Sequence, residues 1–242
     1  TLENEHGVKV STVEHLLAAI YFANIDNAII EIDCDEVPIM DGSAKNFLDT
    51  FKKIEIKQLS EKRKYLTVSN KIEVIDGNRK ISIEPNNQTL EVEFQLNYDN
   101  QLIGKQKNLV DFDKDDLNDV SNSRTFCLYE DIEKIKKNGL AKGGSLDNAL
   151  VVDKGKVLNK EGLRNSKEFV NHKILDLAGD CILSGYRILG KIKCYQGGHE
   201  LTNLFLHKIF KEYALLNFVE FEDILISKKA KSNSAFKLVA NA

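Results

Sequence analysis

The chain has 242 residues, 42% of them hydrophobic, which suits one large globular domain or two small ones. Its 34 basic and 37 acidic residues give a net charge of −3, which argues against a general nucleic-acid-binding protein. No apolar run approaches the roughly 18 residues of a membrane span, and the polar residues 1–10 do not form a secretory signal. We therefore expect no nucleic-acid partner and at most a peripheral membrane contact.

Cysteine usage indicates a reducing compartment. The chain contains four cysteines that lie far apart and form no CxxC pair: Cys34, Cys127, Cys181 and Cys194. A cysteine-type structural zinc site is not expected from this spacing. With no disulfide framework in the sequence, the cytoplasm is the expected location.

The first elements in chain order are helices around a short strand. Ser11 and Glu14 have the spacing of a capping box, which predicts a helix that begins at Ser11 and ends near Ala23. Apolar patterning then predicts three further elements: a buried strand over 27–32, a loop over 38–43 and an amphipathic helix over 44–53.

From Tyr65 onward the pattern changes to alternating strands. Asp76-Gly77-Asn78 is a typical hairpin turn. The predicted strands are 65–69, 71–75, 80–84, 90–96, 149–153, 156–158 and 191–195. The predicted helices are 130–138, 168–184 and a last one from about 199 to 216.

The order of these elements repeats. A helix with a histidine (His15 or His172) is followed by a strand, a glycine-containing turn and a second helix. Some fifty residues of strands precede the second copy but only about ten residues precede the first. We therefore predict an α+β fold of two similar units, each a sheet packed on two helices, with the opening strands of the first unit missing through truncation. The expected parts are the remainder of a first domain (1–60), a second domain (64–228) and a C-terminal tail (229–242).

A metal site is suggested by one helix. His172 and Asp176 are four residues apart, so both side chains project from one face and can bind one Zn²⁺. His15, at the matching place in the first copy, is the natural third ligand, and Glu14 could take a proton from a zinc-bound water. Four simpler readings stay open: a surface His–Asp salt bridge, a purely capping role for Glu14, a solvated Lys173, and a polar helix opening at His199.

Longer motifs resemble one family. Residues 11–16 (STVEHL), 38–44 (PIMDGSA), 123–126 (SRTF) and 169–176 (FVNHKILD) are similar to segments of the UDP-3-O-acyl-N-acetylglucosamine deacetylases, in the same order. Shorter matches lie at 25–28, 143–145, 147–149, 179–180 and 198–199. The resemblance implies a cytoplasmic enzyme of a Gram-negative-type bacterium that removes acetate from a UDP-sugar carrying a fatty acyl chain during lipid A synthesis. We expect the enzyme to be a monomer.

The resemblance also implies individual roles. His15, His172 and Asp176 match the Zn²⁺ ligands, and Glu14 matches the general base. The remaining catalytic matches are His199 as the acid, Asp180 as its orienting carboxylate, Thr125 as a hydroxyl at the intermediate, and Lys173 near the diphosphate.

In the same family an insertion forms a passage for the acyl chain. The matching stretch here is about 126–152, with Phe126, Ile132, Ala141 and Val151 as expected lining residues, although ordinary core roles are equally open. Two departures are Cys127-Leu128, where the family often has Gly-Phe, and Gln196, where a lysine is frequent.

Two alternative functions stay open at this point. One is an inactive truncated fragment that binds a nucleotide sugar without turnover. The other is a zinc deacetylase that acts on a different acetylated sugar.

Overall fold

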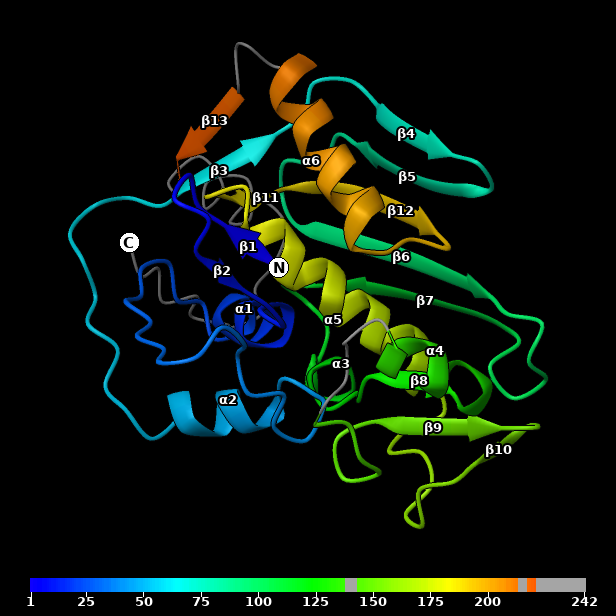
Figure 1. Ribbon diagram of the computed structural model, residues 1–242. Helices are drawn as coiled ribbons and strands as arrows, with labels where there is room; N and C mark the ends of the chain where they lie inside the picture. The colour runs from blue at the N-terminus through cyan, green and yellow to red at the C-terminus, as the bar shows by residue number, and fades with distance from the viewer. Residues whose placement is uncertain (138–142, 213–216, 221–242) are drawn as a thin grey trace.

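The computed structural model describes residues 1–137, 143–212 and 217–220. These residues form a mixed α+β structure in which several small sheets pack against helices (Figure 1). The largest sheet has five strands, in the order β4 (Ile72–Asp76), β5 (Arg79–Glu84), β12 (Gly190–Tyr195), β6 (Leu90–Asn97) and β7 (Lys105–Asp111). Two long helices, α5 (Glu168–Ile182) and α6 (His199–Glu212), cover one face of this sheet.

Side-chain alternation explains how the five-stranded sheet meets its helices. Along β6, Leu90, Val92, Phe94 and Leu96 are buried, whereas the polar residues between them are partly exposed. Successive side chains of a strand point to opposite faces, so this pattern gives the sheet one apolar face. The buried side of α5 packs against that face, with Phe169, Val170, Ile174 and Leu175 fully buried.

Smaller sheets lie at the two ends of α5. One contains β11 (Arg187–Ile188), β3 (Lys64–Thr67) and β13 (Asn217–Glu220). Another contains β10 (Lys156–Val157), β9 (Leu150–Asp153) and β8 (Phe126–Leu128). A two-stranded hairpin joins β1 (Leu2–Glu3) and β2 (Lys9–Val10), and the remaining short helical pieces are α3 (Asn118–Ser121), η1 (Tyr129–Asp131) and α4 (Ile132–Lys137).

Helix α1 (Glu14–Phe22) packs on α5, and this contact holds the first part of the chain against the second. Gly179 permits this contact, because a Cβ at that position would lie 2.2 Å from the backbone oxygen of Glu14. A second helix, α2 (Lys45–Phe51), packs beside α1. The close α1–α5 crossing sets the distance between the side chains that each helix carries.

Most predicted elements are present within a few residues, but two predictions for the first part are wrong. Residues 27–32 form no strand: no segment in the described part of the chain pairs with them, and Ile29 is 95% exposed. The capping box is also absent. Helix α1 begins at Glu14, and Ser11 instead donates its hydroxyl to the Asp35 carbonyl, in an extended segment that bridges to Glu36.

Six of the described strands were not predicted: β1, β2, β7, β8, β11 and β13. No helix in the described part of the chain combines the length and apolar character that a membrane span requires.

Candidate metal centre and active site

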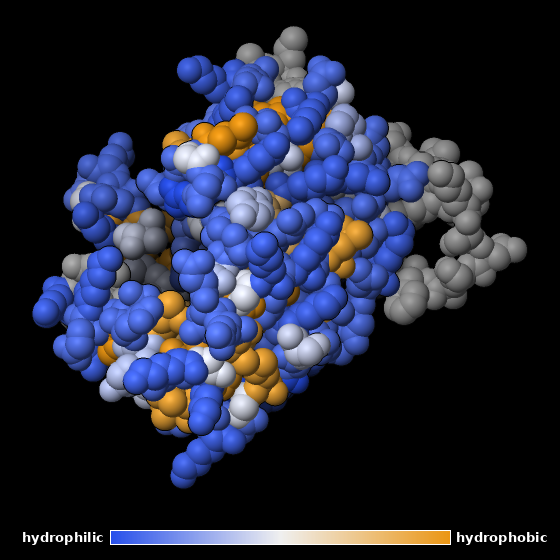
Figure 2. Space-filling view, turned by 90° about the vertical axis from the view of Figure 1, so that its right-hand side faces the viewer, coloured by the Kyte–Doolittle hydropathy of each residue, from blue (hydrophilic) through white to orange (hydrophobic). Residues whose placement is uncertain are grey.

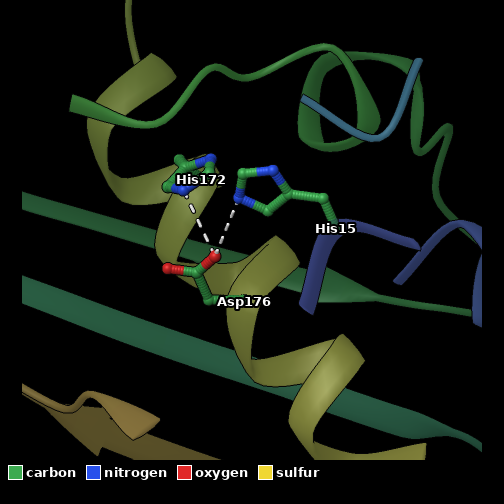
Figure 3. Close-up of side chains that lie close together, drawn as sticks. All are labelled: His15, His172 and Asp176. Carbon is green, nitrogen blue, oxygen red and sulfur yellow. Dashed lines mark ion pairs between the residues drawn. The ribbon is translucent and has the colours of Figure 1, made fainter. Parts of the chain in front are cut away.

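Three ionisable side chains meet where α1 crosses α5 (Figure 3). His15 comes from the first turn of α1, and His172 and Asp176 come from successive turns of α5. Nε2 of His172 lies 3.2 Å from Oδ1 of Asp176, and Nε2 of His15 lies 3.7 Å from the same oxygen. All three side chains are buried. One carboxylate oxygen and two imidazoles therefore converge in a space shielded from solvent.

The converging atoms are suited to a cation. Oδ1 of Asp176, on which the two imidazoles converge, is buried without a hydrogen-bond partner among the described residues, and leaving such an atom unsatisfied is costly. Burial, and then His172, lower the pKa of His15 to about 3, so this imidazole is in the neutral form that binds metals. Burial acts to raise the pKa of Asp176, but His172 and Lys173 outweigh it and hold the pKa well below its usual range. A carboxylate beside neutral imidazole is a donor set for a divalent metal ion.

Protein contacts hold the ligands from behind. Nδ1 of His172 lies 3.0 Å from the carbonyl oxygen of Ser123. Because a carbonyl only accepts, Nδ1 of His172 is the donor in this contact, and Nε2 faces Asp176. Lys173 donates to Oδ2 of Asp176 at 2.8 Å, which turns Oδ1 toward the two histidines. The sequence predicted Lys173 near the site but not this contact.

The open side of the site carries the groups predicted for proton transfer. Nδ1 of His199 lies 2.9 Å from both carboxylate oxygens of Asp180, and Nε2 of His199 lies 3.8 Å from Oε1 of Glu14. The hydrogen bond with Asp180 outweighs the opposing effect of burial and raises the pKa of His199 to about 9. His199 is thus a cation at neutral pH, although its side chain is 51% exposed.

Thr125 and Phe126 follow the Ser123 carbonyl along the chain. The Thr125 N–H donates to the Gly42 carbonyl at 2.7 Å, and its own carbonyl accepts from Leu150 at 2.8 Å. Gly42 has φ +82°, and a Cβ there would lie 2.1 Å from the Asn148 carbonyl oxygen, so only glycine fits this crossing. The contacts of Thr125 given by the structure are thus backbone contacts, and none brings its hydroxyl to the metal ligands.

Phe126 links the metal centre to a pocket. Its ring packs edge-on against His172, with 6.4 Å between centroids, and against Tyr98, with 5.9 Å. Tyr98 is one of the residues that line a pocket of about 840 Å³. The others are Asn97, Asp99, Asn100, Gln101, Leu128, Tyr129, Glu130, Val152, Asp153, Lys154 and Gly155.

The predicted acyl-contact residues relate to this pocket in different ways. Val151 is buried and does not line the pocket, whereas its neighbour Val152 does, as alternation along β9 requires. Ile132 is partly buried at the start of α4 and is also not a lining residue. Ala141 lies outside the described residues. On the side of the molecule at the right of Figure 1, apolar surface gathers mainly in the lower half, at the height of β9 and β10 (Figure 2).

Sequence reasoning assigned no role to Ser123, Arg124 or Glu168. Ser123 and Arg124 belong to the same motif as Thr125 and Phe126, the two residues to which the family resemblance gives roles. Arg124 and Glu168 form a buried ion pair beside His172. Burial of charged residues is unusual and has no signature in a single sequence, so only the structure reveals these neighbours of the ligand.

Comparisons with known proteins agree with this geometry. Residues 1–211 match the family model of UDP-3-O-acyl N-acetylglycosamine deacetylase. The UDP-3-O-acyl-N-acetylglucosamine deacetylase of Saccharophagus degradans is 43% identical over 222 residues, which cover 90% of this chain and 73% of the relative. Those of Pasteurella multocida (40% identical; 92% and 73% covered) and Pseudoalteromonas translucida (38%; 91% and 74%) are similar over matching stretches. The chain therefore belongs to the UDP-3-O-acyl N-acetylglycosamine deacetylase family.

Proposed function

We propose that this chain hydrolyses the acetamide of a UDP-3-O-acyl-N-acetylglucosamine, with Zn²⁺ as its metal, in the synthesis of lipid A. The observation that carries the proposal is the buried convergence of His15, His172 and Asp176 in a chain of this family. Relatives named for this substrate share about two fifths of the aligned residues.

The ligand set favours zinc. Two imidazoles and one carboxylate are a typical catalytic zinc set, in which three protein ligands leave a fourth position open. Bound there, Zn²⁺ would polarise the acetamide carbonyl and make a water molecule more acidic. An amide needs this help because it is a poor electrophile with a poor leaving group.

The open side of the site supplies the proton transfers. Glu14, at the first residue of α1, is placed to take the proton from the attacking water. His199 is protonated at neutral pH, so it can stabilise negative charge on the carbonyl oxygen and donate a proton to the departing amine. Asp180 orients the imidazole and maintains its charge. Thr125 is proposed to assist at the intermediate and Lys173 to face the diphosphate side while it holds Asp176.

The fatty acyl chain is proposed to pass Phe126 and enter the pocket lined by Leu128, Tyr129 and Val152. The edge contacts from His172 through Phe126 to Tyr98 connect the reacting centre to this pocket. Ile132 and Val151 are proposed to support its walls. A monomer is the proposed oligomeric state.

The division into two domains remains a prediction. Its support is the segment after α2, where residues 54–63 contain no helix or strand before β3 begins at Lys64. The finer idea of two similar units, each with a sheet on two helices, is likewise proposed.

Acetate release from an acylated UDP-N-acetylglucosamine, measured with one equivalent of Zn²⁺, tests the function. Wild-type chain is expected to release acetate, and His172→Ala is expected to abolish both release and tight zinc binding. Full activity of His172→Ala would refute the metal assignment. Equal rates with and without the acyl chain would instead favour a deacetylase of another sugar, and zinc binding without turnover would favour an inactive form.

A further inference from the structure

We infer that Arg124 and Glu168 are positioning residues for the metal ligand His172. They act by fixing the peptide unit between Ser123 and Arg124, whose carbonyl contacts the imidazole. The inference rests on the proposed metal-dependent function and names a device that supports it.

The central observation is that one peptide unit is hydrogen-bonded at both ends to a single helix. Its carbonyl, from Ser123, lies 3.0 Å from Nδ1 of His172. Its N–H, from Arg124, donates to Oε1 of Glu168 at 3.1 Å. Glu168 and His172 are four residues apart at the start of α5, so their side chains lie on one face of the helix, one turn from each other.

The glutamate is itself held by a buried ion pair. Nε of Arg124 donates to Oε1 of Glu168 at 2.8 Å, and Nη2 donates to Oε2 at 3.2 Å, so the contact is bidentate. The backbone N–H of Arg164 donates to the same Oε2 at 2.6 Å. Arg124 is only 1% exposed and Glu168 is fully buried. A planar guanidinium with this fork geometry fixes a carboxylate more tightly than a lysine could.

The remaining N–H groups of the guanidinium anchor the pair to the loop before α5. Nη2 of Arg124 donates to the Gly162 carbonyl at 2.7 Å, and Nη1 pairs with Glu161. The peptide plane therefore cannot rotate without breaking several charge-assisted hydrogen bonds. A fixed plane keeps the Ser123 carbonyl on Nδ1 of His172 and Nε2 toward Asp176. Contacts of this kind usually alter metal affinity by about tenfold to a hundredfold when lost.

Zinc affinity, measured by competition with a chelator, tests the inference in the full chain. Arg124→Lys keeps the positive charge but cannot make the bidentate contact with Glu168. It is expected to weaken Zn²⁺ binding about tenfold. Arg63→Lys is the matched control. Arg63 is also buried, and the hydrogen bonds that the structure gives for it go to Asp26 (2.6 Å), Asn24 and Tyr65. Arg63→Lys is expected to lower thermal stability while leaving zinc affinity within about twofold of wild type.

Two further measurements keep the inference testable if Arg124→Lys fails to fold. Glu168→Gln retains the shape and one acceptor oxygen, so a fall in its zinc affinity would support the inference by itself. In the wild-type chain, ¹⁵N NMR of the His172 imidazole is expected to show hydrogen on Nδ1, with a change of this signal in the folded variants.

An Nε2–H tautomer in the wild type, or wild-type zinc affinity in a folded Arg124→Lys or Glu168→Gln, would overturn the inference. Failure of the wild type to bind zinc would instead count against the proposed function.

Discussion

The two sides of the candidate site differ in burial and in what holds their side chains. The ligand side consists of His15, His172 and Asp176, all of them buried, with His172 only 1% exposed. The proton-transfer side consists of Glu14, Asp180 and His199, and the His199 side chain is 51% exposed. On the ligand side, the Ser123 carbonyl holds His172 and Lys173 holds Asp176. The groups of the proton-transfer side mainly contact one another.

This difference indicates separate tasks. Buried ligands with fixed orientations form the metal site before any substrate arrives, which reduces the cost of organising it during the reaction. A histidine near solvent can exchange its proton and recover it after each turnover. Changes on the ligand side should therefore remove the metal and all activity, whereas changes on the proton-transfer side should alter rate and pH dependence with the metal retained.

The largest effect is expected from Asp176→Asn. The change removes the negative charge that two imidazoles face and weakens the contact with Lys173. We expect zinc affinity to fall by more than about a hundredfold, which exceeds the usual effect of losing a residue that only holds a metal ligand in place. Acetate release should become undetectable. Zinc content after dialysis and acetate release are the measurements. Asp49→Asn is the control. It disrupts an exposed ion pair with Lys45 on α2, and its zinc content and acetate release should match those of the wild type.

Glu14→Gln should separate the two sides most clearly. The amide keeps the size of the side chain but cannot take a proton, so acetate release should fall by about a hundredfold to ten-thousandfold. Zinc affinity should stay within about twofold of wild type, since Glu14 is proposed as a base and not as a ligand. If zinc is lost together with activity, the proposed division between the two sides is wrong.

The sequence was informative where chemistry follows local spacing. His172 and Asp176 are four residues apart on a helix, and the structure places both on its buried face. The predicted approach of His15 to this pair depends on the α1–α5 crossing, and the structure brings all three together. The amphipathic helices and the hairpin at Gly77-Asn78 were likewise set by short-range patterns.

Long-range contacts explain what the sequence could not provide. β7 alternates poorly and is ordered by its pairing with β6, so its pattern alone did not predict a strand. Residues 27–32 have a strand-like sequence but pair with no other residue that the structure describes. The ion pair of Arg124 and Glu168 joins residues 44 positions apart, and single-sequence patterns carry no information on such a pairing.

On the proton-transfer side, Asp180→Asn should change the pH profile. In the wild type, the hydrogen bond from Asp180 raises the pKa of His199 from its ordinary 6.5 to about 9. The protonated form is the proposed acid, so activity should persist at neutral pH and fall as pH rises through about 9. Without the carboxylate the pKa should drop toward its ordinary value, which moves this fall to lower pH and costs about tenfold to a hundredfold in rate under mildly alkaline conditions.

The measurement for Asp180→Asn is kcat/KM for acetate release across neutral and alkaline pH, with zinc content followed in parallel. If kcat/KM falls at the same alkaline pH in Asp180→Asn as in the wild type, a group other than His199 must cause the fall. Asp116→Asn, an exposed carboxylate before α3, is a suitable control because it does not contact His199.

The smallest effect is expected at the pocket, from Leu128→Ala. Leu128 is partly buried and lines the pocket that Phe126 connects to His172, so shortening it removes apolar contact with an acyl chain without touching either side of the site. We expect KM for the acylated substrate to rise about tenfold with kcat nearly unchanged, the size of effect that a few methylene groups produce in an apolar pocket. Leu158→Ala, an exposed position outside the pocket lining, should leave KM unchanged. Turnover of unacylated UDP-N-acetylglucosamine should be the same in both variants and the wild type. An equal loss with both substrates would show that Leu128 acts on the reacting centre, and the acyl chain would then have to take another path.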